Sequence, residues 1–332
     1  MAQQRPHVFV TRRLPGDAVE RLRAQASVDL WDGDLPPPRA VLLERAREAD
    51  GLISLLTERI DEEFLRACPR IKAVCNVAVG FDNIDLAACT RHGVFATNTP
   101  RVLTDTTADF AFALLMAAAR RVVEGDHFSR SGEWKTWDPG GLLGTDVHGG
   151  TLGLVGVGQI GGAVARRGRG FEMKILYTDA VPRPDLEAEL GLMRSELDPL
   201  LQAADFVSLH VPLLPETRHL IGARELALMK PTAVLINTSR GPVVDGAALA
   251  KALKAGRPGF AALDVTEQEP IALDDPLLGL PNCIVTPHIA SGSLTTRANM
   301  ASLAVENLLE ALAGRVPPTC LNPEAATNRR GD

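Results

Sequence analysis

The sequence contains few aromatic residues and no excess of positive charge, and both features argue against a nucleic-acid-binding protein. Aromatic side chains make up 4% of the chain, so few are present on which bases could stack. The 35 Lys and Arg residues are outnumbered by 41 Asp and Glu residues, which gives a net charge of −6. No basic stripe stands out that would neutralise a run of phosphates. We therefore expect no nucleic-acid partner.

The sequence also lacks a hydrophobic run long enough to cross a membrane. The longest run, residues 110–119, is about half the length that a membrane-spanning helix requires, and Asp109 and Arg120 flank it. The N-terminal segment MAQQRPHVFV contains no apolar region that ends in a cleavage site for secretion. We therefore expect a cytoplasmic protein without a membrane partner.

Cysteine is scarce, and no spacing of residues suggests a metal site. The five cysteines form an odd set without a CxxC pair, and no pair of His or Cys residues has the spacing of zinc ligands. None of the cysteines stands in a motif with a base that would activate it. We expect free thiols in a reducing compartment, no catalytic thiol and no bound metal.

The pattern of apolar runs predicts two α/β domains. At 332 residues, the chain exceeds the size that one hydrophobic core usually supports. Short apolar runs alternate with charged helical stretches from His7 to about Asn98, and apolar runs recur from Thr151 to about residue 289. This alternation is typical of strand-helix units with parallel sheets. We therefore expect an α/β fold with two Rossmann-like domains built on doubly wound parallel sheets.

The segments between these runs suggest how the domains are connected. A helical segment is predicted from about Thr104 to Ser131, followed by an irregular excursion rich in Gly and Trp over residues 132–150. A long helix is predicted from Ser291 to about Ala313, and the tail after it is expected to return to the first domain. The substrate-binding domain would then be discontinuous, comprising residues 1–99 and 290–332, with a nucleotide-binding domain at residues 100–289.

A glycine-rich turn predicts where a dinucleotide binds. Gly156, Gly158 and Gly161 lie in the segment GVGQIG, which follows the predicted strand Thr151–Val155 and opens a helix. The first glycine permits a tight turn, the second lets the backbone approach a pyrophosphate, and the third allows close packing of helix on strand. Glycine-rich turns also simply connect strands to helices, so the pattern gains its weight from the strand before it and the helix after it.

Asp179 favours NAD over NADP. It stands at the end of the next apolar strand, where a carboxylate accepts hydrogen bonds from the hydroxyls of the adenosine ribose. A 2′-phosphate there would meet a like charge. Asp179 is alternatively a turn residue after a strand, and the nearby Arg183 leaves the use of NADP(H) open. We expect NAD(H) as the preferred cofactor, with NADP(H) as the alternative.

Glu269 and His288 have the chemistry of a proton-donating pair. Each stands beside a proline and shortly after an apolar strand, which predicts that both lie at the carboxyl edge of the sheet, where ligands bind. Reduction of a ketone by hydride transfer creates an alkoxide that must receive a proton, and imidazole suits this task because its unperturbed pKa is about 6.5. A carboxylate bonded to the far ring nitrogen orients the imidazole and favours its protonated form. An isolated His or Glu on a loop, however, is more often structural or exposed.

Arg240 has the chemistry of a carboxylate clamp. It follows the predicted strand at residues 233–238 and precedes Gly241-Pro242. A guanidinium at the same sheet edge would bind the carboxylate of a 2-keto acid and polarise its carbonyl. Taken alone, Arg240 is explained equally well by a salt bridge that closes the turn. Because three groups of suitable chemistry follow three strands, we expect Arg240, Glu269 and His288 to catalyse 2-keto acid reduction together.

Seven sequence segments resemble those of one enzyme family. They are NVAVGFDNIDLAAC, GVFATNTPRVLTDTTADFAFALLMAAAR, GEWKTW, TLGLVGVGQIG, NTSRGPVVD, AALDVTEQEP and VTPHIASGS. Over about residues 7–323, the chain resembles the D-isomer-specific 2-hydroxyacid dehydrogenase family, and most closely its glyoxylate/hydroxypyruvate reductase branch. The resemblance implies hydride transfer from NADH to C2 of glyoxylate or hydroxypyruvate, which gives glycolate or D-glycerate.

The resemblance also implies roles for individual residues. Arg240, Glu269 and His288 would be the catalytic residues, and the backbone N–H groups of Val79 and Gly80 would bind the substrate carboxylate, with Arg240 and His288 also contacting the substrate. The implied cofactor site is lined by Thr107, Gly156, Gly158, Gln159, Ile160, Gly161, Asp179, Pro212, Thr217, Thr238, Ser239 and Asp264. Family members form dimers, so the resemblance implies a homodimer with an arm at about residues 120–148, from which Trp137 reaches the substrate pocket of the neighbouring subunit.

Two alternative functions remain open from the sequence. The chain could be a D-2-hydroxyacid dehydrogenase for a bulkier 2-keto acid, such as phenylpyruvate, because the sequence does not define the size of the pocket. It could also be an NAD-sensing binding protein, since corepressor relatives on the same fold retain the catalytic trio. The short tails and the arm suited to a small substrate favour an enzyme.

Overall fold

The computed structural model describes residues 5–330, and the chain divides into two compact units. Unit 1 consists of Met1–Leu103 and Gly292–Asp332, and unit 2 consists of Thr104–Ser291. The beginning and the end of the chain therefore share one unit. The boundaries differ by a few residues from the predicted ones after residues 99 and 289.

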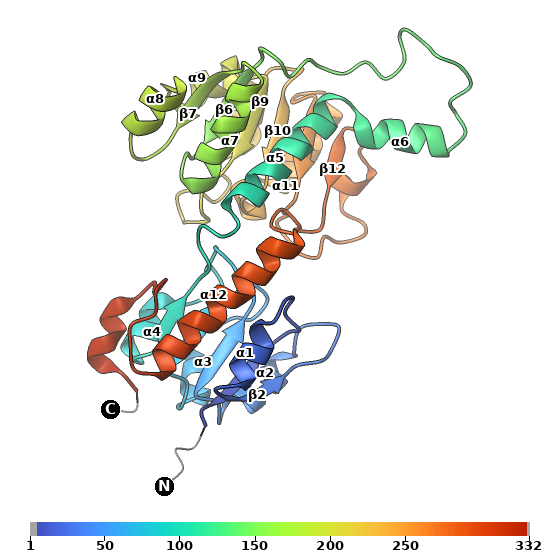
Figure 1. The fold of residues 1–332 in the computed structure, drawn as a ribbon. Helices are drawn as coiled ribbons and strands as arrows, with labels where there is room; N and C mark the ends of the chain where they lie inside the picture. The colour runs from blue at the N-terminus through green and yellow to red at the C-terminus, as the bar shows by residue number, and fades with distance from the viewer. Residues whose placement is uncertain (1–4, 331–332) are drawn as a thin grey trace. The chain divides into compact units, whose positions relative to one another are not determined.

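Unit 1 is built on a five-stranded parallel sheet (Figure 1) with the strand order β2-β1-β3-β4-β5. The strands are β1 (His7–Val10), β2 (Ser27–Leu30), β3 (Gly51–Ser54), β4 (Ala73–Asn76) and β5 (Phe95–Thr97). The helices are α1 (Ala18–Arg23), α2 (Arg39–Ala46), α3 (Glu62–Ala67), α4 (Leu86–Arg91) and α12 (Leu294–Leu312). The inner strands β3 and β4 are buried along their whole length, as parallel strands covered on both faces must be.

Unit 2 is built on a seven-stranded parallel sheet with the order β12-β11-β10-β9-β6-β7-β8. Its strands are β6 (Thr151–Val155), β7 (Lys174–Thr178), β8 (Met193–Arg194), β9 (Phe206–Leu209), β10 (Val234–Asn237), β11 (Phe260–Leu263) and β12 (Cys283–Val285). Its helices are α5 (Thr104–Ala119), α6 (Val122–Arg130), α7 (Gln159–Gly170), α8 (Pro184–Leu190), α9 (Leu197–Ala203), α10 (Ala223–Leu228) and α11 (Gly246–Lys254). Strand order reverses between β6 and β9, so the ligand-binding switch point of a doubly wound sheet lies there. The predicted fold class is confirmed.

Two apolar cores cover opposite faces of the seven-stranded sheet. On one face, α5 and α7 pack against strand residues such as Leu154 and Ile236. On the other face, α9, α10 and α11 pack against the neighbouring residues Val155 and Leu235. Because successive side chains of a strand point to opposite faces, β6 and β10 supply both cores. These strands therefore read as continuous apolar runs in the sequence.

The edge strands β2 and β8 are not evident from the sequence. The residues of β2, SVDL, are exposed or half-buried, and β8 consists of two exposed residues. Each strand pairs on one side only. Without a buried face on both sides, neither strand needs the apolar run that marks the inner strands, so the usual sequence signal is missing.

The single helix predicted at residues 104–131 is wrong, because the structure divides it in two. Helix α5 ends at Ala119 and α6 begins at Val122, after Arg121 adopts a left-handed backbone with φ of 53°. No residue of α6 is buried, and Figure 1 shows α6 and the loop after it extending away from the sheet of unit 2. Residues 131–150 form neither helix nor strand, in agreement with the predicted excursion. The apolar part of the predicted helix is thus α5 alone.

Within the described chain, no helix combines the length and the apolar composition that a membrane crossing requires. The longest helix, α12, spans 19 residues but carries Arg297, Glu306 and Glu310. Among residues 5–330, no group of three His, Cys, Asp or Glu side chains is arranged to hold a metal ion.

The C-terminal segment closes unit 1 by hydrogen bonds to its sheet. The Asn322 side chain accepts from the N–H of Ala96 at 2.8 Å and donates to the carbonyl of Val94 at 2.9 Å. An isolated antiparallel bridge joins Thr97 to Cys320. Asn322 is 1% exposed, so these bonds replace water around a buried amide.

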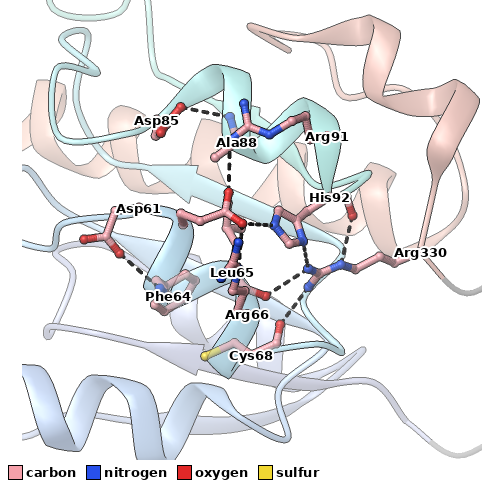
Figure 2. Close-up of polar contacts among 11 residues, drawn as sticks. Asp61, Phe64, Leu65, Arg66, Cys68, Asp85, Ala88, Arg91, His92 and Arg330 are labelled. Carbon is pink, nitrogen blue, oxygen red and sulfur yellow. Dashed lines mark hydrogen bonds and ion pairs between the residues drawn. The ribbon is translucent and has the colours of Figure 1, made fainter.

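The last described residue, Arg330, is held by backbone carbonyls at the ends of α3 and α4 (Figure 2). Its guanidinium donates to the carbonyls of Leu65, Cys68 and His92 at 2.9, 2.7 and 2.9 Å. It also donates to Nδ1 of His92 at 2.9 Å, so Nδ1 carries no proton and Nε2–H donates to Glu62, again at 2.9 Å. The hydrogen bond from His92 is the largest cause that lowers the pKa of Glu62 to about 2.

We expect Arg330→Ala to lower the free energy of unfolding by about 1–3 kcal/mol, because it leaves several carbonyls without their donor. Urea unfolding of the full chain measures this loss. Arg315→Ala is a matched control, since it removes only an exposed ion pair with Glu310 and should change stability little. Equal stability of the two variants would contradict the expectation.

Candidate active site

The glycine turn after β6 lies at the switch point of the seven-stranded sheet. Gly156 has φ of +90°, and a Cβ there would lie 2.8 Å from the carbonyl oxygen of His210, which follows β9. A Cβ on Gly161 would lie 2.2 Å from the carbonyl oxygen of Gly156, so only glycine lets α7 start this close to the turn. Around Gly158, the N-cap of α7, a Cβ would meet nothing within 4 Å. This open space at a helix N-terminus fits a pyrophosphate.

Asp179 is bonded to the same turn. One carboxylate oxygen accepts the N–H of Val157 at 2.7 Å, and the other accepts the N–H of Val181 at 3.2 Å. Arg183 donates to the carbonyl of Val157 and forms a two-pronged ion pair with Asp185, at 2.9 and 2.7 Å. The Arg183 charge is therefore compensated by Asp185, whereas Asp179 adds negative charge beside the turn.

His210 is a neutral histidine at the switch point. Burial lowers the pKa of its imidazole to about 4. Its Nε2 lies 2.9 Å from the hydroxyl of Ser208, the polar residue of β9. The ring therefore brings no positive charge to the glycine turn at neutral pH.

The other predicted cofactor residues lie along the carboxyl edge of this sheet or on α5. Thr107 is buried in the first turns of α5. Thr217 folds the loop after β9, because its hydroxyl donates to the carbonyl of Pro212 at 2.6 Å and accepts the N–H of Leu214 at 2.8 Å. The hydroxyl of Thr238, just after β10, is buried and has no partner within residues 5–330. A buried hydroxyl without a partner fits a site that receives a polar ligand.

A buried asparagine shapes the turn that carries Arg240. Asn237, the last residue of β10, is 1% exposed. Its Oδ1 accepts the N–H and the hydroxyl of Ser239 at 3.0 and 2.8 Å, and its Nδ2 donates to the carbonyl of Arg240 at 2.9 Å. Ser239 thus serves the turn by its own hydrogen bonds. Asn237 was not predicted as a site residue, although an amide inside the apolar run AVLIN is the signal that could have identified it.

Glu269 and His288 are in direct contact. Nδ1 of His288 lies 2.7 Å from Oε2 of Glu269, while Oε1 of Glu269 accepts the N–H of Thr266 at 3.2 Å. An ionised carboxylate only accepts, so Nδ1 carries a hydrogen and Nε2 is left as the nitrogen that exchanges a proton. This is the arrangement that holds an imidazole in one tautomer for acid-base chemistry.

The turn that carries His288 is held by Asp264, which is 1% exposed. Its carboxylate accepts the hydroxyl of Thr286 at 2.6 Å and the N–H groups of Ile289 and Ala290 at 2.9 and 2.7 Å. His288 itself has φ of 56°, a backbone conformation that is strained for a residue with a side chain. The contacts of Asp264 therefore indicate that it positions His288, in addition to any contact with a cofactor.

The Arg240 turn and the Glu269 loop are packed against each other. A Cβ on Gly241 would lie 1.8 Å from the carbonyl oxygen of Thr266, so only glycine allows this approach. Strands β10, β11 and β12, which precede Arg240, Glu269 and His288, are neighbours in the sheet. The three predicted catalytic residues therefore come from adjacent strand ends of one unit.

Val79 and Gly80 belong to unit 1, where they follow β4. Asn98 donates to the carbonyl of Val79 at 2.7 Å, and Asn76 donates to the carbonyl of Gly80 at 3.1 Å. The N–H groups of Val79 and Gly80 donate to no acceptor within residues 5–330. The loop is thus fixed through its carbonyls, and its N–H groups have the chemistry to bind an anion. Sequence reasoning missed Asn76 and Asn98, although Asn76 ends an apolar strand.

Trp137 lies on the extended arm of unit 2 and is 78% exposed. Trp134 is 63% exposed, and Val122 and Val123 of α6 are more than half exposed. The arm returns to its unit where the N–H of Thr145 donates to the carbonyl of Ala119 at 2.8 Å. The apolar side chains of the arm are therefore open to solvent in a single chain.

The glycine turn, the switch point and Asp179 together define a protein of the dinucleotide-binding class. A family model described as the NAD-binding domain of D-isomer specific 2-hydroxyacid dehydrogenases matches residues 112–290. A glyoxylate reductase of Korarchaeum cryptofilum is 53% identical over 326 residues, which cover 98% of each chain. A glyoxylate reductase of Thermococcus kodakarensis is 49% identical over 330 residues, covering 98% of this chain and 99% of that one.

Solved structures agree with these similarities. An NADPH-dependent glyoxylate/hydroxypyruvate reductase of Sinorhizobium meliloti, in complex with NADP and malonate, aligns with a TM-score of 0.87 at 31% identity, covering 99% of this chain and 100% of that one. A protein of Thermus thermophilus aligns with a TM-score of 0.90 at 47% identity, covering 95% and 99%. The chain belongs to the D-isomer specific 2-hydroxyacid dehydrogenase family and is an oxidoreductase that acts on 2-hydroxy acids.

The lowered pKa of His210 predicts a loss of stability in acid. Its pKa falls from 6.5 to about 4 on folding, so between these values the unfolded chain binds a proton that the folded chain does not. The free energy of unfolding therefore decreases as pH falls through this window. In the parent chain, His210 should account for up to about 3 kcal/mol of the decrease in the free energy of unfolding on acidification, and His210→Gln should remove this part of the decrease. Urea unfolding of both proteins at pH 7 and pH 4.5 measures the difference. An unchanged pH dependence in the variant would contradict this expectation.

Proposed function

We propose that this chain reduces glyoxylate and hydroxypyruvate with NADH, giving glycolate and D-glycerate. The observation that carries the proposal is the 2.7 Å contact between His288 and Glu269 beside the Arg240 turn. The relatives at 53% and 49% identity are glyoxylate reductases, which supports glyoxylate as a substrate. Similarity to a glyoxylate/hydroxypyruvate reductase supports hydroxypyruvate.

In the proposed reaction, each catalytic side chain has a separate task. Bound NADH supplies the hydride that adds to C2 of the keto acid. Arg240 binds the substrate carboxylate and polarises the carbonyl. His288 donates the proton from Nε2 to the carbonyl oxygen as it becomes a hydroxyl. The Glu269 carboxylate contacts Nδ1 of His288, so it holds the imidazole in place and keeps Nε2 as the donor.

Each unit has a proposed role. Unit 2 binds the dinucleotide at the glycine turn, with Thr107, Gln159, Ile160, Pro212, Thr217, Thr238, Ser239 and Asp264 lining the cofactor site. Unit 1 binds the substrate carboxylate through the N–H groups of Val79 and Gly80. The hydrogen bonds of Asn98 and Asn76 to the carbonyls of this loop support the second role, because they hold the two peptide groups in fixed orientations.

NAD(H) is the proposed preferred cofactor. The carboxylate of Asp179 beside the glycine turn disfavours a 2′-phosphate through like charge. Arg183 would favour that phosphate, but it is paired with Asp185.

A homodimer is also proposed. In this dimer, the arm at residues 120–148 packs its exposed apolar side chains against the neighbouring subunit, and Trp137 reaches the substrate pocket of that subunit. A cytoplasmic location remains a prediction from the sequence.

His288→Ala should lower kcat for glyoxylate by roughly 100-fold or more, because it removes the proton donor. NADH affinity, measured by fluorescence titration, should stay nearly unchanged. Glu269→Gln should also lower kcat, since a neutral amide no longer stabilises the imidazolium. Unchanged turnover in His288→Ala would exclude the proposed mechanism.

Initial rates of the parent enzyme with glyoxylate, hydroxypyruvate, pyruvate and phenylpyruvate distinguish the proposed substrates from a bulkier keto acid. If the enzyme turns over none of these four keto acids, a nucleotide-sensing protein is favoured instead.

Asp179→Ser should raise the ratio of kcat/KM for NADPH to kcat/KM for NADH by roughly fivefold or more, because it removes the like-charge repulsion of the 2′-phosphate, which is worth about 1 kcal/mol or more at about 4 Å. Initial rates with each cofactor at saturating glyoxylate measure this ratio. An unchanged ratio would show that Asp179 does not determine cofactor choice.

A further inference from the structure

A second histidine-glutamate pair lies next to the pair of His288 and Glu269. Nε2 of His219 lies 2.6 Å from Oε1 of Glu267, two residues before Glu269 in the same loop. His219 belongs to the loop after β9, far from Glu267 in the sequence. Neither residue is needed for any step of the proposed reaction, so the pair calls for a separate explanation.

The Glu267 carboxylate connects three segments of unit 2. Its Oε1 contacts His219, and its Oε2 accepts the N–H of Gly246 at 3.0 Å. Gly246 is the first residue of α11, where the N–H groups have no partner inside the helix. The approach is close, because a Cβ on Gly246 would lie 3.1 Å from the same oxygen. The loop at residues 266–269 is therefore tied at one point to both the His219 loop and α11.

The His219 loop is in turn tied to the segment after Arg240. The N–H of His219 donates to the carbonyl of Pro242 at 2.8 Å, and Ile221 and Val244 form a parallel bridge. Gly241 packs directly on the backbone of Thr266 and Glu267. The Arg240 turn, the His219 loop and the loop that carries Glu269 thus each contact the other two.

The physical properties of the pair indicate a positional effect rather than a stabilising one. The side chains of His219 and Glu267 are 42% and 37% exposed, and ion pairs with this exposure contribute little to stability. His219 nevertheless adopts φ of 53°, a backbone conformation that carries strain in a residue other than glycine. Strain that persists for little gain in stability is typical of residues that hold a functional site in place.

We infer that the His219–Glu267 pair positions the loop at residues 266–269, so that the Glu269 carboxylate meets Nδ1 of His288 in the orientation that proton donation requires. This inference rests on the proposed roles of Glu269 and His288. His219 and Glu267 are positioning residues, because they act through Glu269. Loss of the pair lets the loop move, and small displacements of a catalytic group lower turnover without changing how tightly the cofactor binds.

The test uses variants of the full chain that break the pair in different ways. Glu267→Gln keeps the size of the side chain but replaces one accepting oxygen by an amide NH₂. His219→Asn tolerates the left-handed backbone but is too short to reach Glu267. His219→Gln restores a donor near the position of Nε2. We expect Glu267→Gln and His219→Asn to lower kcat for glyoxylate about three- to tenfold, with NADH affinity and melting temperature nearly unchanged, and His219→Gln to recover most of the rate.

Glu172→Gln is the matched control, since it breaks another histidine-glutamate pair of unit 2. His148 and Glu172 lie 3.3 Å apart, are 71% and 77% exposed, and precede β6 and β7 at the amino edge of the sheet. This variant should keep the parent kcat. If Glu267→Gln and His219→Asn behave like Glu172→Gln while His288→Ala is inactive, the positioning role is overturned and the proposed function stands.

Two further outcomes are decisive. If the pair-breaking variants lose rate only together with a large drop in melting temperature, and His219→Gln fails to restore the rate, the pair is merely structural and the inference is wrong. If His288→Ala and Glu269→Gln keep the parent kcat, the proposed function itself is wrong. A loss of rate in Glu267→Gln alone is a different result, so the two failures can be distinguished.

Discussion

The buried carboxylate of Asp264 is the interaction on which the candidate active site depends. It is 1% exposed, and its two oxygens accept hydrogen bonds from Thr286, Ile289 and Ala290. A carboxylate can be buried only if such donors replace water. The backbone after β12 folds around Asp264, and His288 has its left-handed conformation within this turn. This turn and the Glu269 loop together place the His288 ring next to the Glu269 carboxylate.

A buried polar side chain also orders the turn at the end of the neighbouring strand, β10. Asn237 is also buried at the end of a strand, and its amide bonds the turn that carries Arg240. In both places a buried polar residue orders the backbone, and the backbone then presents a functional side chain to the carboxyl edge of the sheet. The glycines of the site serve the complementary purpose. Gly156, Gly161 and Gly241 stand where any side chain would collide with a carbonyl group, so they let turns approach each other.

Much of the fold was predictable because its inner strands are buried on both faces and separated by helices. The apolar runs that predict β6, β9, β10 and β11 are a direct consequence of that burial. Prediction failed where burial is partial: the edge strands β2 and β8 carry no apolar run, and the helix predicted to Ser131 is interrupted at Arg121, where the chain leaves the core. The periodicity of apolar residues indicates which side chains are buried. It does not indicate where a helix breaks because the core that it packs against ends.

The sequence by itself determined the doubly wound fold, the position of the glycine turn and the residue types for 2-keto acid chemistry, because each of these leaves a local pattern of apolar runs, glycines or strand ends. Only the tertiary structure decided which polar groups meet. The bond between His288 and Glu269, the pairing of His219 with Glu267 and the return of Arg330 to α3 join residues far apart in the chain. Such pairs depend on how loops fold after their strands, and the hydrogen-bond geometry that selects them exists only once the backbone is in place.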